Sequence, residues 1–231
     1  MGSRKLNQYA GAITAQQAAA GMNTALRNAR RLLKDAKHLL DIGSYPTAAS
    51  LAALSIEESG KTAILRELVV ARDEKEIGQA WKRYRSHTQK NVAWLLPQLV
   101  AQGARHLEDF RSLFDTGADH TQLLDSLKQL GFYTDCLGRA HWSEPEKVVD
   151  EKLARQLVEV ADILCRSREI TVREIELWIK HVKPVWRGPM EWMKKAVANW
   201  YADMQREGLI KKPDDGMEAF LFGRKSTSPS G

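Results

Sequence analysis

One stretch constrains the fold of this chain more than any other: residues 42–61, which read Ile-Gly-Ser-Tyr-Pro-Thr-Ala-Ala-Ser-Leu-Ala-Ala-Leu-Ser-Ile-Glu-Glu-Ser-Gly-Lys. From residue 42 to residue 56 there is no charged side chain, and most side chains are small. A helix of this composition is apolar on nearly all sides, so other helices must enclose it. Glu57, Glu58 and Lys61 follow directly, and carboxylates at the end of a buried helix need partners. The stretch therefore predicts a buried central helix whose uncharged part ends in a polar cluster.

The residues before this helix predict an antiparallel helical hairpin. Gly43 is suited to end a preceding helix, Ser44 to cap the next one, and Pro46 to lie in its first turn. The preceding helix is expected over residues 14–41, and the central one continues to about residue 72. Apolar residues recur in the first of them at spacings of three and four: Met22, Leu26, Ala29, Leu33, Ala36 and Leu40.

Two interpretations of the polar cluster remain open. Glu57 and Lys61 stand at i, i+4, where an ordinary surface pair stabilises a helix by roughly 0.2 to 0.5 kcal/mol. The buried lead-in and the adjacent Glu58 favour a functional polar pocket instead. Gly60 costs about 1 kcal/mol relative to alanine inside a helix, so it indicates close packing or a bend at this point.

A third helix is predicted over residues 74–100, with two faces and a kink or break at Pro97. Its core face is predicted to carry Ile77, Trp81, Tyr84, Thr88, Val92, Leu95 and Leu99. On roughly the opposite side lie Arg83, His87, Lys90 and Trp94, with Arg85 nearby.

The histidine of this second face is a candidate general base. Protonation of an imidazole between cations is disfavoured, so His87 is expected to be neutral near pH 7 and able to deprotonate a hydroxyl beside an anionic phosphate. An ordinary solvent-facing histidine is the alternative. Because this face points away from the core of its own subunit, we expect a site in a groove or across a dimer interface.

The first helix has a cationic side that carries a single acid, Asp35. Its cations are Arg27, Arg30, Arg31, Lys34 and Lys37. The whole chain has a formal net charge of +6, which favours an anionic partner such as nucleic acid. The stripe is either a phosphate-binding surface or a solvated helix face. Asn28, unusual within a helix, is expected to point into a polar site.

Residues 104–130 are expected to form one or two shorter helices around a break at Asp115-Thr-Gly117. Residues 132–145 show no helical period but carry three aromatic side chains, which is typical of a loop over a core or a pocket. Tyr133 and Asp135 either complete a polar site or act as a wedge and a turn residue.

Three more helices are predicted towards the C-terminus. Ser143 with Glu146 can form a capping box for one, and Thr171 with Glu174 can open the next, which ends before Pro184. The last, over residues 186–207, has an apolar stripe that is typical of a core or partner helix.

Several classes of protein are not expected. The chain has two cysteines far apart, which predicts neither a disulfide framework nor a zinc site, and His141 has no second ligand at metal-binding spacing. Residues 6–26 are uncharged but too polar for a membrane span. There is no Walker loop or GxGxxG turn. We therefore predict an all-α cytoplasmic protein with no metal, cofactor or membrane partner.

With these motifs in order, the chain resembles the AbiV family of abortive infection proteins, a branch of the HEPN superfamily, over about residues 24–184. The resemblance rests on a series of short motifs: Asn28-Ala29, Leu32-Leu33-x-Asp35-Ala36, Ala-x-Leu-Ala-x-x-x-Ile-Glu57-Glu58-x-Gly60-Lys61, Arg85-Ser-His87-x-x-Lys90, Gly131-Phe-Tyr133-Thr-Asp135 with Trp142 and Pro145, and Thr171-x-x-Glu174-Ile-Glu176-Leu-Trp178. It implies a HEPN-like antiparallel helical bundle, which we expect over residues 1–184. The segment after Pro184 lies outside the resemblance, and its apolar stripe predicts a C-terminal amphipathic helix extension over 185–223. A disordered tail is expected over 224–231.

The resemblance also implies a homodimer in phage defence that arrests translation or growth. Many HEPN proteins are metal-independent ribonucleases with an Arg-x4-His motif in a pocket at the dimer interface. In this chain Lys82 stands five residues before His87, and Arg83 stands four before it. A lysine offers a point charge where arginine offers a bidentate fork.

Two functions follow as hypotheses. In the first, His87 takes the 2′-OH proton of RNA, Lys90 with Arg83 or Arg85 stabilises the phosphorane, and Glu57, Glu58 and Lys61 orient these groups. In the second, a non-catalytic module blocks RNA, ribosomes or a translation factor, with a phage protein as its switch, and Arg27, Arg30 and Arg31 carry the binding. A metal-dependent nuclease that uses Glu57, Glu58 and Asp135 ranks third.

Overall fold

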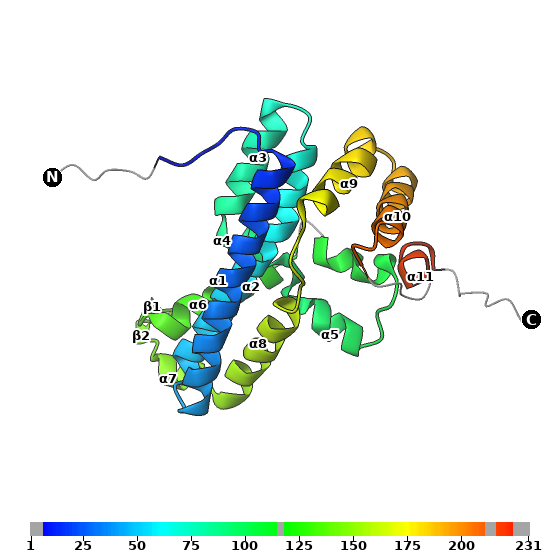
Figure 1. Ribbon diagram of the computed structural model, residues 1–231. Coiled ribbons are helices and arrows are strands. Elements are labelled where there is room, and N and C mark those ends of the chain that lie inside the picture. The colour runs from blue at the N-terminus through cyan, green and yellow to red at the C-terminus, as the bar shows by residue number, and fades with distance from the viewer. Residues whose placement is uncertain (1–6, 115–117, 211–215, 224–231) are drawn as a thin grey trace, which may run out of the picture.

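Two long antiparallel helices, α1 (Ala15–Asp41) and α2 (Tyr45–Val70), form the centre of the molecule (Figure 1). The computed structural model describes residues 7–114, 118–210 and 216–223. Thr14 caps α1 through a capping box with Gln17. The predicted hairpin is thus confirmed, with its boundaries close to those expected.

The turn between α1 and α2 explains why the chain reverses there. Gly43 has a φ of 80°, the left-handed conformation that favours glycine. The amide of Gly43 donates to the carbonyl of Leu40, and the amide of Ser44 donates to that of Leu39. This pair of bonds is a Schellman motif, which satisfies carbonyls that the end of α1 leaves free. Ser44 precedes α2, but its side chain makes no capping hydrogen bond.

As predicted, α2 is enclosed on nearly all sides. Besides α1 and the 3-10 turn η1 (Val92–Leu95), it contacts the helices α3 (Glu74–Arg85), α4 (His87–Lys90), α6 (His120–Phe132), α7 (Pro145–Val148), α8 (Glu151–Leu164) and α9 (Val172–Val182). Its alanines at positions 48, 49, 52 and 53 are at most 2% exposed. A Cβ added to Gly131 of α6 would lie 2.3 Å from Ser50 Oγ, so this glycine lets α6 lie directly on α2.

The prediction of one continuous helix over residues 74–100 is wrong. The segment divides into α3, α4, the 3-10 turn η1 (Val92–Leu95) and α5 (Leu96–Ala101), in whose first turn Pro97 lies. The first break is at Ser86, which is extended. At the second, the Asn91 side chain is fully buried and donates to the carbonyl of Thr121. Tertiary contacts with α6 therefore outweigh helical continuity.

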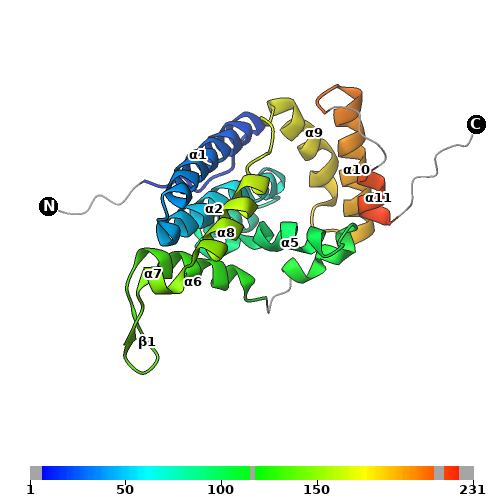
Figure 2. The same ribbon diagram turned by 90° about the horizontal axis from the view of Figure 1, so that it is seen from below.

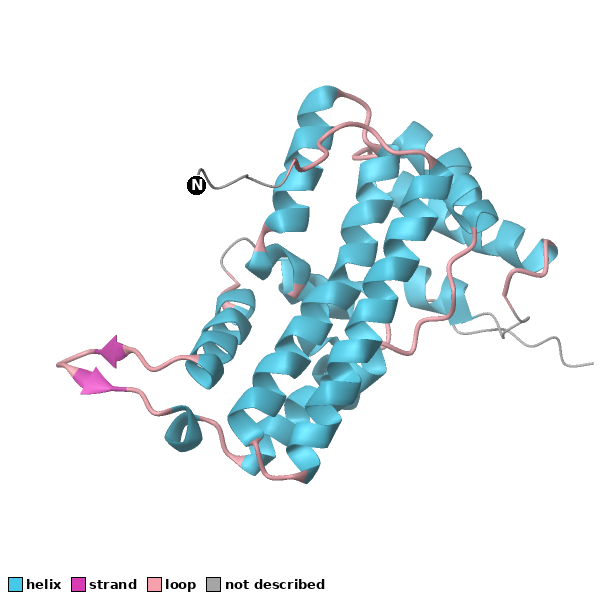
Figure 3. Ribbon diagram, turned by 60° about the vertical axis from the view of Figure 1, so that its left-hand side comes forward, coloured by secondary structure: helices cyan, strands magenta, loops and turns pink. Residues whose placement is uncertain are grey.

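A small hairpin projects from the helices at the end of α6 (Figures 2 and 3). Its antiparallel strands, β1 (Cys136–Leu137) and β2 (His141–Trp142), lie in the segment expected to be a loop. The predicted capping box of Ser143 with Glu146 is absent. The Ser143 hydroxyl accepts a hydrogen bond from the Asp135 amide instead, and Asp150 caps α8.

The remaining elements complete one side of the molecule (Figure 2). They are η2 (Leu107–Phe114), η3 (Lys183–Val185), α10 (Met190–Arg206) and α11 (Gly216–Phe222). The α10 helix packs on α9, where the rings of Trp178 and Trp200 meet edge to face at 5.1 Å, and its Ala196 is buried in the same apolar cluster as Met22 of α1. It is thus a core helix, one of the two expected roles. The predicted break at 115–117 and tail at 224–231 lie outside the described residues.

Candidate functional site

The carboxylate of Glu57 is the centre of a buried polar cluster. The residue is 3% exposed. Its Oε1 accepts a hydrogen bond from Lys128 Nζ at 2.6 Å, and its Oε2 lies 2.8 Å from His87 Nδ1. Lys90 Nζ lies 3.4 Å from the same Oε2. Residues of α2, α4 and α6 thus meet at a single carboxylate.

This cluster forms within one chain. The expectation that the face of His87 and Lys90 points away from the core of its own subunit is wrong, because the break at Ser86 redirects α4 towards α2. The His87 side chain is 58% exposed and bonds Glu57 through Nδ1. No described residue occupies Nε2, so that nitrogen is open to an incoming group. The charged group nearest to the ring is a carboxylate, whereas the sequence had suggested cations on both sides.

Lys128 and Asp125 also belong to the cluster, although their sequence pattern did not indicate it. Lys128 Nζ lies 2.6 Å from Asp125 Oδ1, and its side chain is only 4% exposed. In the sequence the two residues stand at i, i+3 on an amphipathic helix, a pattern typical of a solvated surface pair. Only the contact of α6 with α2 shows that the lysine is buried.

The pKa values of the two buried lysines shift in opposite directions. Burial lowers the pKa of the Lys90 ammonium below its ordinary value, and nearby Lys61 lowers it further, although Glu57 partly opposes both. Burial also lowers the pKa of Lys128, but its hydrogen bonds to Asp125 and Glu57 outweigh this effect and place the pKa above its ordinary value. Lys128 is therefore the firmly protonated cation of the cluster.

Gly60 brings α2 and α4 into contact beside the site. A Cβ added at Gly60 would lie 1.6 Å from the carbonyl oxygen of Lys90, which is far inside van der Waals contact. The close packing predicted from this glycine is confirmed.

Replacing Gly60 with alanine is expected to lower the free energy of unfolding by about 2 kcal/mol or more, because the backbone of α4 must move. Thermal unfolding followed by circular dichroism should show a fall in Tm of roughly 4 to 8 °C. Gly78→Ala is the matched control, since a Cβ there meets nothing within 4 Å. It should leave Tm unchanged or raise it. Equal effects of the two changes would contradict the packing argument.

Glu58 and Lys61 lie next to the cluster but pair with each other. Their side chains are 2.5 Å apart, and Lys61 Nζ lies 5.1 Å from the ring centroid of Tyr84. The i, i+4 pair of Glu57 with Lys61, one of the two interpretations left open, is not formed, because Glu57 contacts Lys128 and His87 instead. Both charges act on the ammonium of Lys90.

Comparison with known families shows to which family this chain belongs. The family model of the AbiV branch of HEPN proteins matches residues 17–166. The chain belongs to the AbiV family. Membership indicates a part in abortive infection, which is a form of defence against phage. Neither the comparison with curated proteins nor the one with solved structures finds a significant match.

Two arginines expected in the site of this AbiV chain lie elsewhere. Arg83 pairs with Glu67 of α2. Arg85 donates to the carbonyl of Tyr9 at 2.5 Å and lies over the ring of Trp81. The structure brings neither guanidinium to His87, because the break at Ser86 ends the face that they share in the sequence.

The three supporting residues also lie away from Glu57. Asn28 accepts hydrogen bonds from Arg31 on the outer side of α1. Tyr133 is 63% exposed beside the hairpin. Asp135 is a turn residue, whose Oδ1 accepts from the amide of Cys136 and whose backbone pairs with Ser143. For Asp135 the geometry thus fits the second of the two interpretations left open, that of a turn residue.

Most of the cations on α1 have partners. Arg27 donates to Thr24, and Arg31 pairs with Asp35 at 3.3 Å. Arg30 donates to the carbonyls of Cys165 and Ser167, so it holds the segment between α8 and α9 in place. Lys34 makes no hydrogen bond or ion pair with any described residue, and it lines a shallow cavity of about 400 Å³ together with Arg30.

A metal ion does not suit the Glu57 cluster. Donor atoms of Glu57, His87 and Asp125 lie within 4.8 Å of one another, a spacing that a cation can bridge. The ammonium of Lys128 already lies 2.6 Å from both carboxylates, and Lys90 adds a second positive charge. The cluster thus carries its own cations, which would repel a divalent ion. The set proposed for a metal-dependent nuclease, Glu57 and Glu58 with Asp135, is not brought together.

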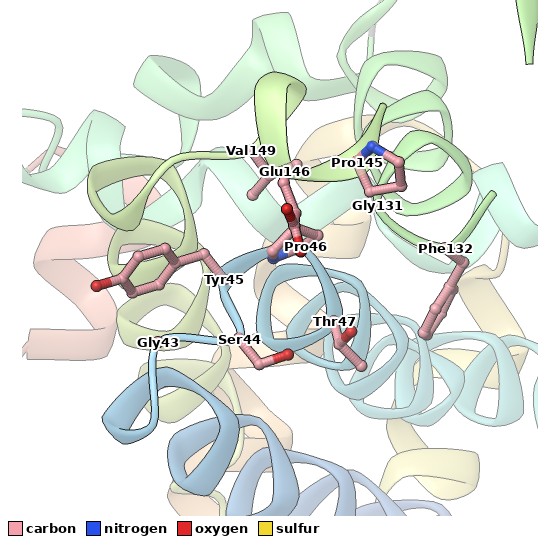
Figure 4. Close-up of a pocket in the computed structure, with 10 residues that line it drawn as sticks. All are labelled: Gly43, Ser44, Tyr45, Pro46, Thr47, Gly131, Phe132, Pro145, Glu146 and Val149. Atoms are coloured by element: carbon pink, nitrogen blue, oxygen red, sulfur yellow. The ribbon is translucent and has the colours of Figure 1, made fainter. Parts of the chain in front are cut away.

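A separate cavity of about 450 Å³ lies where α2 begins, between it, the end of α6 and α7 (Figure 4). None of the residues expected in the site lines it.

In the part of the chain that the structure describes, no helix is both long and apolar enough to span a bilayer.

Proposed function

We propose that this AbiV-family chain acts in phage defence as an effector that arrests translation or growth by cleaving RNA. His87 serves as the catalytic base, and no metal ion takes part. The observation that supports this most is the hydrogen bond between His87 Nδ1 and the buried carboxylate of Glu57. A carboxylate at Nδ1 fixes the orientation and tautomer of an imidazole, so Nε2 is left as the basic nitrogen.

The chemistry requires only groups that the chain supplies. His87 Nε2 takes the proton of a ribose 2′-OH, and the oxygen attacks the adjacent phosphorus. A bond forms between O2′ and phosphorus while the bond to the 5′-oxygen breaks, which yields a cyclic phosphate. The proton held by His87 is then available for the departing 5′-oxygen. General acid and base catalysis of this kind contributes typically 10²- to 10⁴-fold to a rate.

Positive charge near the imidazole favours the transition state. Lys90 belongs to the Glu57 cluster and Lys61 lies beside it, and charge that develops on a phosphorane is stabilised by cations fixed in advance. Arg83 and Arg85 are not assigned this role, because their side chains point elsewhere. Since Glu57 and His87 meet within one chain, the proposed chemistry does not depend on a residue from a second copy.

The proposal is tested by incubating the purified protein with total cellular RNA in the presence and absence of EDTA. We expect cleavage in both conditions, because no metal ion takes part. The fragments should end in a cyclic phosphate, because the ribose 2′-oxygen attacks the phosphorus. Activity that disappears in EDTA would contradict the proposal and favour metal-dependent chemistry.

The same preparation distinguishes the second hypothesis. Translation in a cell-free extract that stops while all RNA stays intact would indicate a module that blocks its target by binding. In that case charge reversal at Arg27 and Lys34 should relieve the block, since these exposed side chains of α1 have no carboxylate partner among the described residues.

A further inference from the structure

Lys128 is a buried cation that links two carboxylates. Its Nζ lies 2.6 Å from Oε1 of Glu57 and 2.6 Å from Oδ1 of Asp125, and its side chain is 4% exposed. Lys90, the other cation on Glu57, is more distant at 3.4 Å, which is beyond the usual length of a strong hydrogen bond. Lys128 is therefore the principal counter-ion of Glu57.

The cluster forms a chain of contacts from α6 through α2 to α4. The ammonium of Lys128 donates hydrogen bonds to Asp125 and to one oxygen of Glu57. The other oxygen of Glu57 is hydrogen-bonded to His87. Asp125 is the partly exposed end of this chain, at 29% side-chain exposure. At the opposite end the imidazole faces solvent.

We infer that Lys128 is a positioning residue of the His87 site: its ammonium stabilises negative charge on the Glu57 carboxylate and holds that carboxylate directed at His87 Nδ1. The consequence for catalysis rests on the proposed function, whereas the electrostatic coupling between Lys128 and His87 does not. A lysine that only joined α6 to α2 would need no third group on the carboxylate. Here the same carboxylate carries the exposed imidazole on its second oxygen.

The electrostatic coupling predicts in which direction a charge in the cluster changes proton binding by Glu57 and His87, and this direction can be measured. The charged and titratable groups that face the cluster are Glu57, Glu58 and Lys61 of α2, His87 and Lys90 of α4, and Asp125 and Lys128 of α6. Glu57 and His87 form a hydrogen-bonded pair, and a proton bound by either group adds one positive charge to that pair. A positive charge at Lys128 disfavours that proton, and a negative charge at Asp125 favours it.

The test is an NMR titration of the His87 ring and the Glu57 carboxyl carbon in the full chain. Lys128→Met should move the midpoint for proton uptake by the pair upward by about one pH unit, because a cation is lost. Asp125→Asn should move it downward by about half a unit, because an anion is lost at greater distance. Lys147→Met is the matched control, since Lys147 forms an exposed i, i+3 pair with Glu144.

Opposite shifts in the two variants support the inference. Shifts in the same direction, or shifts below about 0.2 pH unit in both, would overturn it. Asp125→Asn keeps the shape of a partly exposed side chain, so it provides an answer even if Lys128→Met does not fold.

RNA cleavage gives a second readout that separates the two proposals. If the chain cleaves RNA, Lys128→Met should lower kcat roughly tenfold and move the pH profile of kcat upward with the titration. Opposite titration shifts in a chain that cleaves no RNA would refute the proposed function and leave the coupling intact. Cleavage with an unmoved titration and pH profile would refute the role of Lys128 alone.

Discussion

Replacing His87 with alanine is expected to lower the rate of RNA cleavage by about 10²- to 10⁴-fold, which is the usual contribution of a general base. The substitution should change the fold very little, because the side chain is 58% exposed and makes one hydrogen bond to Glu57. Cleavage of a short labelled RNA, followed under single-turnover conditions, measures this effect. Tm should fall by only a few degrees.

A second histidine provides the control for this experiment. His141 is exposed on the hairpin and has no contact with the Glu57 cluster. We expect His141→Ala to cleave RNA at the rate of the unmodified protein. If His87→Ala and His141→Ala cleaved RNA at equal rates, or if both still arrested growth in cells, the assignment of His87 as the base would be wrong.

Replacing Glu57 with alanine is expected to have the largest effect on stability. It would leave the ammonium of Lys90 buried without a carboxylate in contact and would remove one of the two partners of Lys128. Breaking a buried ion pair by removing one partner typically costs 3 to 5 kcal/mol. For a chain of 231 residues, about 3 kcal/mol corresponds to a fall in Tm of roughly 6 to 12 °C.

Chemical denaturation of Glu57→Ala and of a surface control tests this expectation. Glu144 pairs with Lys147 where both side chains are more than half exposed, so Glu144→Ala should change the free energy of unfolding by less than about 0.5 kcal/mol. Glu57→Gln, which keeps the shape of the side chain, should lie between the two. An unfolding free energy of Glu57→Ala within error of the control would show that the cluster contributes no stability.

The burial of Glu57 could be predicted from the sequence because it follows from composition. A long uncharged run of small residues has no polar face to turn to water, so its helix must lie inside the bundle and carry Glu57 with it. Gly60 likewise indicated close packing, because glycine costs stability in a helix unless its missing side chain is needed. The family motifs indicated His87 and Lys90 as candidates to meet this acid.

Helical period alone misplaced the partners of Glu57. It assigned Arg83, His87 and Lys90 to one face, but the chain breaks at Ser86 and Asn91, so only the last two reach the cluster. The signal for these breaks is weak in the sequence, since Asn91 is buried by a hydrogen bond to a carbonyl of α6 that is distant along the chain. Lys128 was missed for a similar reason, because the burial of a lysine depends on which helix lies against it.

The sequence by itself determined that the chain is helical, which family it resembles, where its first two helices begin and end, and that an acid lies buried where the uncharged part of the second helix ends. These features depend on neighbours along the chain and on the amount of apolar surface. Only the tertiary structure decided which side chains neutralise Glu57, because the approach of α4 and α6 to α2 is set by packing between residues far apart in sequence. A buried charge needs a partner, but the charge alone does not specify which residue that is. The packing of the helices determines which side chains reach it.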